Sequence, residues 1–353
     1  MNGKKVMMAM SGGVDSSVAA CLMLESGYEA AGITMCIGVD TGCGEGKTCC
    51  SPADIEDAKK VCRVLGIPHY VLDFSDEMEE LVIKPFIDEY RIGRTPNPCI
   101  RCNEHLKFGL LFDKARAMGF DYLATGHYAR IVNEDNNYYL TESADKEKDQ
   151  TYFLYAVPPV KLGHVLFPLS NYTKPEVRKI AEQRKIPVFQ KPDSQDVCFY
   201  PSGSSTQFFK NRKIKSEPGE IVHADGRVLG KHKGIIYYTI GQRRGLGISS
   251  PEPLYVISID ASTSRIIVGG KNFLKASGLI ADIKIFNSND KCGEALAKIR
   301  YTASASSCRY SLMNDELEVI FDDPQEAVTP GQSVVLYKDR RIIGGGIIKR
   351  VLD

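Results

Sequence analysis

The chain has 353 residues, of which 25% are charged and 43% hydrophobic, and its formal net charge is +1. This length suits two or three domains with their own cores, and no apolar run approaches the ~20 residues that cross a bilayer. The composition therefore predicts a cytoplasmic globular protein without a membrane anchor, in which any site for a polyanion is a local patch.

The N-terminal segment predicts a strand, a glycine turn and a helix. Apolar residues 6–10 precede the run Ser11-Gly12-Gly13-Val14-Asp15-Ser16-Ser17, and a helix is expected over 15–26. The two glycines let the backbone approach an anion closely, and a helix N-terminus favours negative charge. The run is neither a Walker A loop nor GxGxxG. It resembles the SGGxDS signature of the PP-loop ATP pyrophosphatases, which adenylate a carbonyl oxygen and release pyrophosphate.

Further strands and helices alternate up to about residue 203, as a parallel α/β sheet requires. Strands are expected over 29–35, 68–74 and 122–125. Helices are expected over 52–65 after an N-cap at Ser51, over 103–118, and over 174–185 after a capping box formed by Thr173 and Glu176. We therefore expect an adenine-nucleotide alpha-hydrolase-like parallel sheet in an ATP-binding catalytic domain over residues 1–203.

Beyond this domain the sequence becomes rich in Gly, Tyr, Ile and Val. Residues 202–205 are typical of a linker, and short strands are expected over 297–301, 316–321, 333–338 and 342–348. This pattern predicts a small central domain over 204–270 and a C-terminal β-barrel domain over 271–353, with a β-sandwich as the alternative arrangement of its strands.

Eleven cysteines without a secretory signal argue for reactive or metal-binding thiols rather than a disulfide framework. Cys99 and Cys102 lie just before the helix predicted over 103–118, where the helix dipole and Arg101 should lower a thiol pKa. A third thiol, Cys198, lies near the end of the same predicted domain. This set of three thiols has three interpretations: inert packing, a metal or iron–sulfur site, and a nucleophile with a resolving partner.

No catalytic role is predicted for five other cysteines. Cys43, Cys49 and Cys50 lie in or beside the glycine-rich segment 41–48, and their spacing fits no standard zinc pattern. We expect a loop with incidental or redox-active thiols there. Cys21 and Cys62 occupy apolar positions of helices, which predicts that they belong to the core.

Six more segments accompany the glycine turn: Thr95–Asn103, Gly126–Tyr128, Lys148–Phe153, Asp193–Phe199, Gly241–Gly247 and Thr329–Gln332. In this order, and over nearly the whole chain, they resemble the bacterial tRNA-specific 2-thiouridylases, the MnmA family. The resemblance implies ATP-dependent replacement of the C2 oxygen of the wobble uridine (U34) by sulfur in tRNAs for Lys, Glu and Gln. It also implies ATP with Mg2+ and a sulfur donor such as a cysteine desulfurase or a sulfur relay protein.

The resemblance further implies roles for individual residues. ATP contacts fall on Ala9, Met10, Ser11, Gly12, Gly13, Val14, Asp15, Ser16, Met35 and Gly126. Contacts with tRNA fall on Asn97, Pro98, Cys99, His127, Lys148, Asp149, Gln150, Arg300, Tyr301 and Gln332, with residues 97–99 around the target base. The catalytic residues implied are Cys102 as the nucleophile, Cys198 as the cysteine that receives a persulfide, and Cys99 beside the target base.

The sulfur chemistry has two alternatives at this point. Cys99 stands where many family members have an Asp that acts as a general acid/base. The set Cys99, Cys102 and Cys198 is also the pattern by which related tRNA-thiolating enzymes hold a 4Fe–4S cluster through three ligands. In the other route a persulfide on Cys198 supplies sulfur, and a Cys102–Cys198 disulfide remains.

Basic residues are concentrated between Ser205 and Gly245, where nine Lys or Arg residues stand against three acids. With Tyr237 and Tyr238 interleaved, this segment fits a surface that follows RNA phosphates, although a solvated basic face is the alternative. A wobble base has to leave the anticodon stack to reach a buried nucleotide site. Two other function classes share part of the pattern: a different PP-loop ligase or synthetase, which needs no cysteine pair, and a non-catalytic tRNA-binding protein.

Overall fold

The computed structural model describes residues 3–38, 52–193, 197–199, 205–287 and 290–353. The chain forms two compact units: the first contains Met1–Val82 and Cys99–Ser204, and the second contains Ile83–Pro98 and Ser205–Asp353. Among the described helices, none is long and apolar enough to span a bilayer. The predictions for Cys43, Cys49, Cys50, the Ser51 cap and residues 202–204 of the linker lie outside the described residues.

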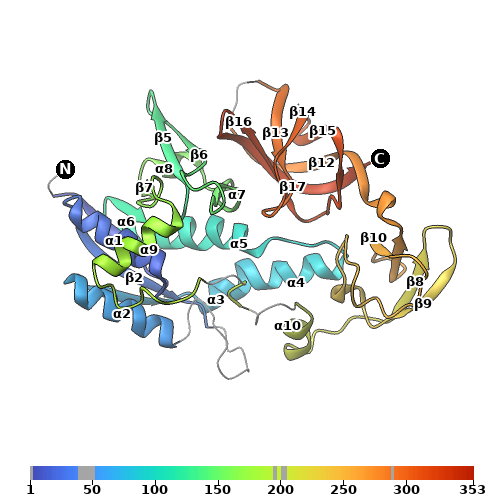
Figure 1. The fold of residues 1–353 in the computed structure, drawn as a ribbon, viewed down its shortest axis with the longest axis horizontal. Coiled ribbons are helices and arrows are strands. Elements are labelled where there is room, and N and C mark those ends of the chain that lie inside the picture. Colours follow the sequence, from blue (N-terminus) through green and yellow to red (C-terminus); the bar gives the residue numbers. More distant parts are fainter. Residues whose placement is uncertain (1–2, 39–51, 194–196, 200–204, 288–289) are drawn as a thin grey trace. The chain divides into compact units, whose positions relative to one another are not determined.

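A five-stranded parallel sheet forms the centre of the first unit (Figure 1). Its strands in spatial order are β3 (His69–Asp73), β2 (Glu29–Cys36), β1 (Lys5–Ala9), β4 (Tyr122–Ala124) and β7 (Val165–Leu166). In β1, Val6 pairs with Ala30 of β2 and with Tyr122 of β4. The predicted parallel α/β sheet is thus confirmed, and the carboxyl ends of β1, β2 and β4 lie side by side.

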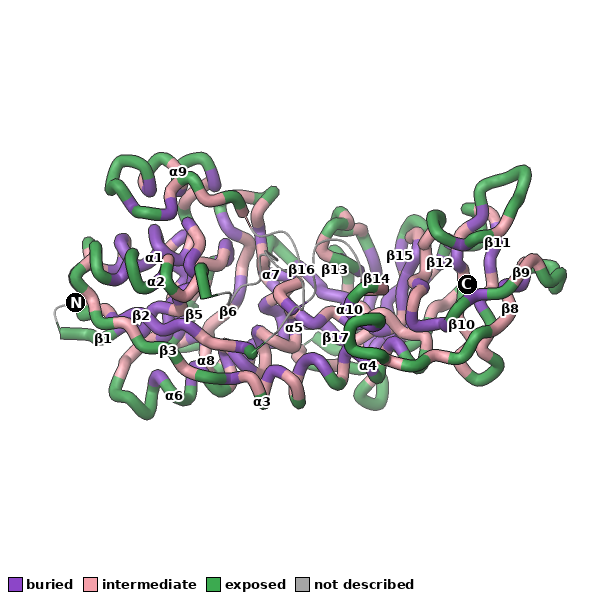
Figure 2. Tube along the Cα trace, turned by 90° about the horizontal axis from the view of Figure 1, so that it is seen from below, coloured by how far each residue is buried: buried purple, intermediate pink, exposed green. Residues whose placement is uncertain are grey.

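Helices cover both faces of this sheet, with α1, α2 and α9 on one face and α6 on the other (Figure 2). The helical segments of the first unit are α1 (Val14–Glu25), α2 (Pro52–Leu65), α3 (Ser75–Met78), α5 (Pro98–Arg101), η2 (Cys102–Leu111), α6 (Phe112–Ala117), α7 (Thr151–Leu154), α8 (Pro159–Leu162) and α9 (Lys174–Gln183). Alternate residues of β1, Val6 and Met8, pack with Val18 of α1, Val61 of α2 and Val177 of α9 in one buried cluster. Cys21 and Cys62 belong to the same cluster, which confirms that they are core residues.

The helix expected over 103–118 begins earlier and has a different geometry. Helical backbone starts at Pro98, so Cys99 lies inside α5 and Cys102 is the first residue of η2, a ten-residue π-helix. The prediction that both thiols precede the helix was wrong, because the fixed φ of Pro98 suits the first helical position. π-Helix is rare and is frequent at functional sites, and Cys102 is the residue at which this π-helix begins.

A β-hairpin that the sequence patterns did not predict also belongs to the first unit. It consists of β5 (Arg130–Glu134) and β6 (Asn137–Thr141), which pair antiparallel. Its two-residue turn, Asp135-Asn136, has φ values of 50° and 65°. These residue types tolerate positive φ in such a turn, so the signal was present in the sequence.

The second unit begins with a helix that packs on a distant part of the chain. After η1 (Glu79–Ile83), α4 (Lys84–Arg91) places Phe86 and Tyr90 against Phe208 and Phe209 of α10 (Ser205–Asn211). The ring centroids of Tyr90 and Phe209 are 5.1 Å apart, and those of Phe86 and Phe208 are 5.8 Å apart. This aromatic cluster explains why residues 83–98 group with the C-terminal part of the chain.

Two β structures complete the second unit. A four-stranded sheet has the order β10 (Tyr255–Asp260), β11 (Arg265–Gly269), β8 (Gly219–His223) and β9 (Val228–His232), with short helices η3 (Ile235–Tyr237) and η4 (Lys271–Leu274). Six strands close a barrel in the order β12 (Lys275–Phe286), β15 (Glu316–Glu326), β14 (Ser306–Met313), β13 (Cys292–Lys298), β16 (Ser333–Lys338) and β17 (Arg341–Leu352), which returns to β12. The predicted C-terminal β-barrel is therefore confirmed.

One barrel strand differs from its prediction over 297–301. The strand β13 ends at Lys298, and Arg300 and Tyr301 lie in the turn that follows. Alternation of apolar residues suggested a strand here because Ile299, only 5% exposed, still points into the barrel core after the backbone has left the sheet. Arg300 and Tyr301 are consequently loop residues.

Candidate functional site

The connection from β1 to α1 forms a cradle at the carboxyl edge of the parallel sheet. Gly13 is the N-cap of α1 and brings no side chain to the helix start. Its carbonyl accepts hydrogen bonds from Ser16 Oγ at 3.2 Å and from Ser17 Oγ at 2.7 Å, while Ser11 N donates to Ser16 Oγ at 3.2 Å. The hydroxyls therefore hold the turn, and the helix N-terminus and its dipole remain suited to an anion.

Position 12 requires a glycine for two reasons, its backbone conformation and the close approach of Asp54. Its φ is +70°, and a Cβ there would lie 2.2 Å from the carbonyl oxygen of Asp54 in the first turn of α2. The Gly12 carbonyl accepts a hydrogen bond from Lys191 Nζ at 3.0 Å, and the same ammonium contacts Asp54 and Asp57 at 2.6 and 2.7 Å. Burial lowers the pKa of Lys191, but these two carboxylates hold it above its usual value. Lys191 thereby fixes the cradle to α2.

Gly126 forms the second wall of the cradle. It follows β4, and a Cβ on it would lie 2.7 Å from Ser16 N and 2.8 Å from the carbonyl carbon of Asp15. The backbone of residue 126 can approach the first turn of α1 only because this residue is a glycine. Met35 lies at the carboxyl end of β2, the other neighbour of β1. The predicted ATP residues thus lie at the ends of three adjacent parallel strands, where open α/β sheets bind ligands.

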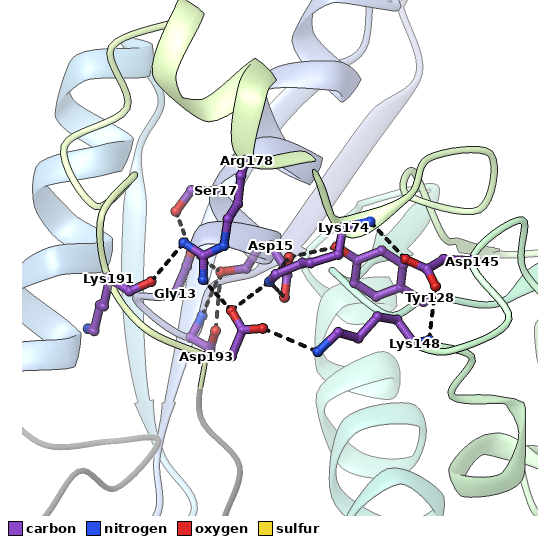
Figure 3. Close-up of polar contacts among 12 residues, drawn as sticks. Gly13, Asp15, Ser17, Tyr128, Asp145, Lys148, Lys174, Arg178, Lys191 and Asp193 are labelled. Carbon is purple, nitrogen blue, oxygen red and sulfur yellow. Dashed lines mark hydrogen bonds and ion pairs between the residues drawn. The ribbon is translucent and has the colours of Figure 1, made fainter. Parts of the chain in front are cut away.

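A network of charged side chains lies beside the cradle, and the sequence analysis missed most of it (Figure 3). Asp15 in the first turn of α1 accepts hydrogen bonds from Tyr128 Oη at 2.9 Å and from Lys174 Nζ at 2.7 and 2.8 Å. Lys174 Nζ also contacts Asp193 Oδ1 at 2.8 Å. Burial and the neighbouring Asp15 raise the pKa of Tyr128, so its hydroxyl stays a donor. The capping box before α9 marked the position of Lys174, but only the fold reveals its partners.

Two further cations bind Asp193 (Figure 3). Arg178 Nη2 lies 2.6 Å from its Oδ1 and Lys148 Nζ lies 3.5 Å from its Oδ2. Burial opposes the charge of Asp193, but Lys174, Arg178 and Lys148 together lower its pKa. Asp145 orders the surroundings by accepting the backbone N–H groups of Lys148 at 3.1 Å and Lys174 at 2.8 Å.

The three candidate thiols, Cys99, Cys102 and Cys198, all belong to the first unit and are half-buried. Arg101 between the first two donates from Nε to the carbonyl of Leu81 at 2.9 Å. In the part of the chain that the structure describes, no three His, Cys, Asp or Glu side chains are placed to hold a metal ion. The described residues therefore do not bring the three thiols together as a cluster site.

Residues predicted to contact tRNA in the first unit have different surroundings. Lys148 is half-exposed. The Asp149 carboxylate is buried and accepts hydrogen bonds from Ser143 N at 2.9 Å and from both the backbone and the hydroxyl of Thr151, and burial raises its pKa. Gln150 Oε1 accepts from Tyr128 N at 3.0 Å. The Asp149 side chain thus holds its own loop, and Lys148 remains the side chain of this segment best suited to a phosphate.

His127 has a partly buried position beside aromatic rings. Its Nδ1 lies 2.7 Å from Thr125 Oγ1, and its ring contacts those of Phe108 and Phe167. Burial, with Lys107 as a second cause, holds the pKa of His127 well below its usual value. The ring is therefore neutral at physiological pH and suits a polar wall more than a cationic phosphate contact.

In the second unit the segment before Cys99 is attached to the barrel. Thr95 N donates to the carbonyl of Pro330 at 2.9 Å, and its own carbonyl accepts from Gln332 Nε2 at 2.7 Å. A Cβ on Gly331, whose φ is +93°, would lie 2.9 Å from Thr95 N. Gln332, assigned to tRNA from the sequence, thus also anchors the segment that contains Asn97 and Pro98.

The basic segment of the second unit is displayed to solvent. All nine of its cations are exposed: Lys210, Arg212, Lys213, Lys215, Arg227, Lys231, Lys233, Arg243 and Arg244. Tyr238, expected among them, is 9% exposed and packs against His232, so it offers no face for stacking with a base. The segment therefore suits contact with phosphates more than contact with bases.

Comparisons with known proteins cover nearly the whole chain. Three family models match: a tRNA methyl transferase HUP domain over 4–202, a tRNA methyl transferase PRC-barrel domain over 207–270, and an aminomethyltransferase beta-barrel domain over 279–348. The three-part fold class expected from the sequence, with a small domain between the α/β part and the barrel, is confirmed by these matches.

Curated relatives match over nearly their full length. The chain is 52% identical over 350 residues to "tRNA-specific 2-thiouridylase MnmA 1" of Syntrophus aciditrophicus, covering 99% of this chain and 94% of that protein. It is 48% identical to "tRNA-specific 2-thiouridylase MnmA" of Acetivibrio thermocellus, covering 99% and 100%, and 47% identical to the protein of the same name of Caldicellulosiruptor saccharolyticus, covering 99% of each.

Proposed function

The chain belongs to the MnmA family of tRNA-specific 2-thiouridylases and is a tRNA-uridine 2-sulfurtransferase, and we propose how its residues divide the reaction. The substrate is the wobble uridine (U34) in tRNAs for Lys, Glu and Gln. ATP activates its C2 oxygen, and sulfur then replaces that oxygen. The observation that carries this proposal is the glycine cradle at α1, closed by Gly126 and lying in the same unit as Cys102 and Cys198.

The cradle binds ATP in the first half-reaction. The C2 oxygen attacks the α-phosphorus, the bond between the α-phosphorus and the bridging oxygen breaks, and pyrophosphate leaves. The N–H groups and dipole at the start of α1 stabilise the phosphates, and the backbone of Gly126 closes the other side. When bound with ATP, Mg2+ would offset the negative charge of the phosphates at the start of α1. Adenylation is needed because a carbonyl oxygen is a poor leaving group.

The thiols act in the second half-reaction. The terminal sulfur of a persulfide on Cys198 attacks C2, and AMP departs with the former C2 oxygen. The Cys102 thiolate then attacks Cys198 Sγ, which breaks the persulfide S–S bond, releases 2-thiouridine and forms a Cys102–Cys198 disulfide. Two electrons from an external dithiol reduce this disulfide. A sulfur donor such as a cysteine desulfurase or a sulfur relay protein renews the persulfide.

The persulfide route is favoured over a 4Fe–4S cluster on one observation. A cluster requires its three cysteine ligands to converge, and the described residues contain no such group. Cys99 in α5 and Cys102 at the start of η2 lie three positions apart in one helical stretch, an arrangement that both routes allow. Cys99, in place of the carboxylate of many relatives, belongs to the wall around the target base.

The tRNA is held by separate surfaces of the two units. The exposed cations of the segment 205–245 contact phosphates, and residues 97–99 surround the flipped base. Lys148 adds a phosphate contact in the first unit. Arg300, Tyr301 and Gln332 contribute from loops of the barrel, two of them in the turn after β13.

Single-cysteine variants test the division of labour. We expect Cys102→Ser and Cys198→Ser to abolish formation of 2-thiouridine, measured by mass spectrometry of digested tRNA, while tRNA-dependent ATP–pyrophosphate exchange continues. Cys292→Ser is the matched control, because Cys292 is exposed in the barrel. Full thiolation by both variants would contradict the roles assigned to Cys102 and Cys198. Binding of tRNA by the wild type without AMP release would contradict the proposed adenylation step.

Iron analysis separates the two sulfur routes. We expect enzyme purified without oxygen to thiolate tRNA when supplied with a persulfide donor, at an iron content near zero in both the wild type and Cys99→Ala. Stoichiometric iron and sulfide with visible absorption in the active wild type, lost in Cys99→Ala, would overturn the persulfide route.

A further inference from the structure

Asn103 directly follows Cys102 in the π-helix η2 and buries a polar side chain. It is 2% exposed, and its Nδ2 donates a hydrogen bond to the carbonyl of Phe153 in α7 at 3.0 Å. Its Oδ1 is also buried and has no hydrogen-bond partner among the described residues. A buried polar atom without a partner lowers stability and is rare in folded proteins, so packing alone does not account for an amide at this position.

The Phe153 carbonyl, the acceptor of Asn103, is connected to the ATP cradle by further hydrogen bonds. Phe153 N donates to the carbonyl of Gln150 at 3.0 Å. Two hydrogen bonds join Gln150 to Tyr128, one from Gln150 N to the Tyr128 carbonyl at 2.8 Å and one from Tyr128 N to Gln150 Oε1 at 3.0 Å. Tyr128 Oη then donates to Asp15 in the first turn of α1 at 2.9 Å (Figure 3). A continuous series of contacts within the first unit thus joins the residue after the nucleophilic thiol to the cradle.

The residues of this series are held in place by their surroundings. Asn103 and Tyr128 are nearly fully buried. The loop that contains Gln150 is fixed by the buried Asp149 carboxylate, which accepts the backbone N–H groups of Ser143 and Thr151 at 2.9 and 3.2 Å. The start of η2 therefore has a defined position relative to the first turn of α1, and the Asn103 amide is the side chain that links η2 to this series.

We propose that Asn103 is a positioning residue that places the Cys102 thiol relative to the ATP site, by fixing the start of η2 to residues 150–153. Its effect falls on the last step of the proposed reaction, in which Cys102 Sγ attacks Cys198 Sγ. The new Cys102–Cys198 bond forms, the bond from Cys198 Sγ to the transferred sulfur breaks, and the electron pair leaves on 2-thiouridine. A displacement of about 1 Å can slow such a step about 100-fold. This inference rests on the proposed function of both thiols.

The disulfide-linked adduct between tRNA and Cys198 measures how well Cys102 is placed, because Cys102 resolves it. Full-length enzyme is loaded with a persulfide, freed of excess donor and mixed with tRNA and ATP without reductant. The adduct is followed on a non-reducing gel and AMP release is followed in parallel. We expect Asn103→Leu, which has a similar volume but no amide, to release AMP at the wild-type rate and to resolve the adduct about 10- to 100-fold more slowly.

Leu111→Ala is the matched control. Leu111 is fully buried and is the last residue of η2, so its truncation disturbs the packing of the same helix at the end opposite Cys102. We expect this variant to lower Tm at least as much as Asn103→Leu does, and yet to resolve the adduct at the wild-type rate. Cys102→Ser is the reference for an adduct that persists until dithiothreitol is added.

The outcomes distinguish the positioning role from the proposed function. Resolution of the adduct at the wild-type rate in Asn103→Leu would overturn the positioning role. Equal accumulation of adduct in Leu111→Ala would overturn it as well, since any loss of packing in η2 would then suffice. If Asn103→Leu fails to fold, Asn103→Ala, which also lacks the amide, takes its place in the same comparison. Failure of the wild type to form 2-thiouridine, or of Cys102→Ser to accumulate an adduct, would refute the proposed function instead.

Discussion

At the scale of single residues, the cradle depends on two glycine positions at which any side chain would collide with neighbouring backbone. Gly12 and Gly126 each bring backbone to within a distance that a Cβ would prevent, the first against α2 and the second against α1. The serine hydroxyls around Gly13 hold the turn from inside. The proposed function therefore assigns recognition of the phosphate chain to backbone geometry more than to a basic side chain.

A Gly126→Ala substitution tests the closed wall of the cradle. The new methyl group would lie 2.7 Å from Ser16 N, so the first turn of α1 has to shift. Overpacking of this kind costs about 1–3 kcal/mol, and we expect ATP to bind about 5- to 150-fold more weakly by calorimetry. Gly270→Ala is the control, because a Cβ there meets no atom within 4 Å. Equal ATP affinity in the two variants would contradict the proposed cradle.

The buried side chain of His232 makes the free energy of unfolding depend on pH. His232 is 2% exposed, donates from Nε2 to the carbonyl of Ser264 at 2.9 Å and accepts from Gly234 N at 3.0 Å. Burial lowers its pKa. The unfolded chain, with a histidine pKa of about 6.5, therefore binds more protons than the folded one below that pH. The contribution of neutral His232 to the free energy of unfolding is therefore fully present above about pH 6.5. It is lost as the pH falls toward the lower pKa that His232 has in the folded protein.

Thermal unfolding between about pH 7 and 5 measures this effect. We expect Tm to fall with decreasing pH in the wild type and to fall less steeply in His232→Asn, whose amide can still accept from Gly234 N but does not titrate. A Tm that rises on acidification, or identical slopes in both proteins, would show that His232 does not titrate in this way.

At the scale of elements, sequence patterns predict the helices, strands and caps whose formation depends on nearby residues. The strand–turn–helix around Gly12, the capping box of α9 and three of the six barrel strands, β15, β16 and β17, follow from apolar periodicity and end signals, and the structure has them. The π-helix η2 does not follow, because its hydrogen-bond pattern is selected by packing rather than by local propensity. The end of β13 was misjudged for a related reason, since burial of Ile299 continues beyond the sheet.

The turn of residues 329–332 is an element whose role can be tested. Gly331 and Gly226 have nearly the same φ, +93° and +92°, but only Gly331 faces another backbone, that of Thr95. Alanine at either position costs about 1 kcal/mol or more for its conformation. We expect Gly331→Ala to lose additional stability, and thiolation to slow, because the segment before Cys99 is displaced. Matching Tm and thiolation rates in Gly331→Ala and Gly226→Ala would disprove the anchor.

At the scale of the whole molecule, distant stretches of sequence come together in each unit. Asp15, Tyr128, Lys174 and Asp193 are brought into one network by the parallel sheet, and no spacing in the sequence announces it. Residues 83–98 join the second unit through aromatic contacts with α10, which a linear division of the chain does not foresee. The chemistry-bearing segments were recognisable from the sequence, whereas their connections required the fold.

The central claim is that the C2 oxygen of the wobble uridine leaves on AMP. A tRNA substrate with oxygen-18 at C2 of U34 is incubated with the enzyme, ATP and a persulfide donor, and the AMP is analysed by mass spectrometry. We predict one labelled AMP for each 2-thiouridine formed, with unlabelled pyrophosphate. Unlabelled AMP accompanying the same yield of 2-thiouridine would contradict the adenylation of the base and with it the role assigned to the cradle.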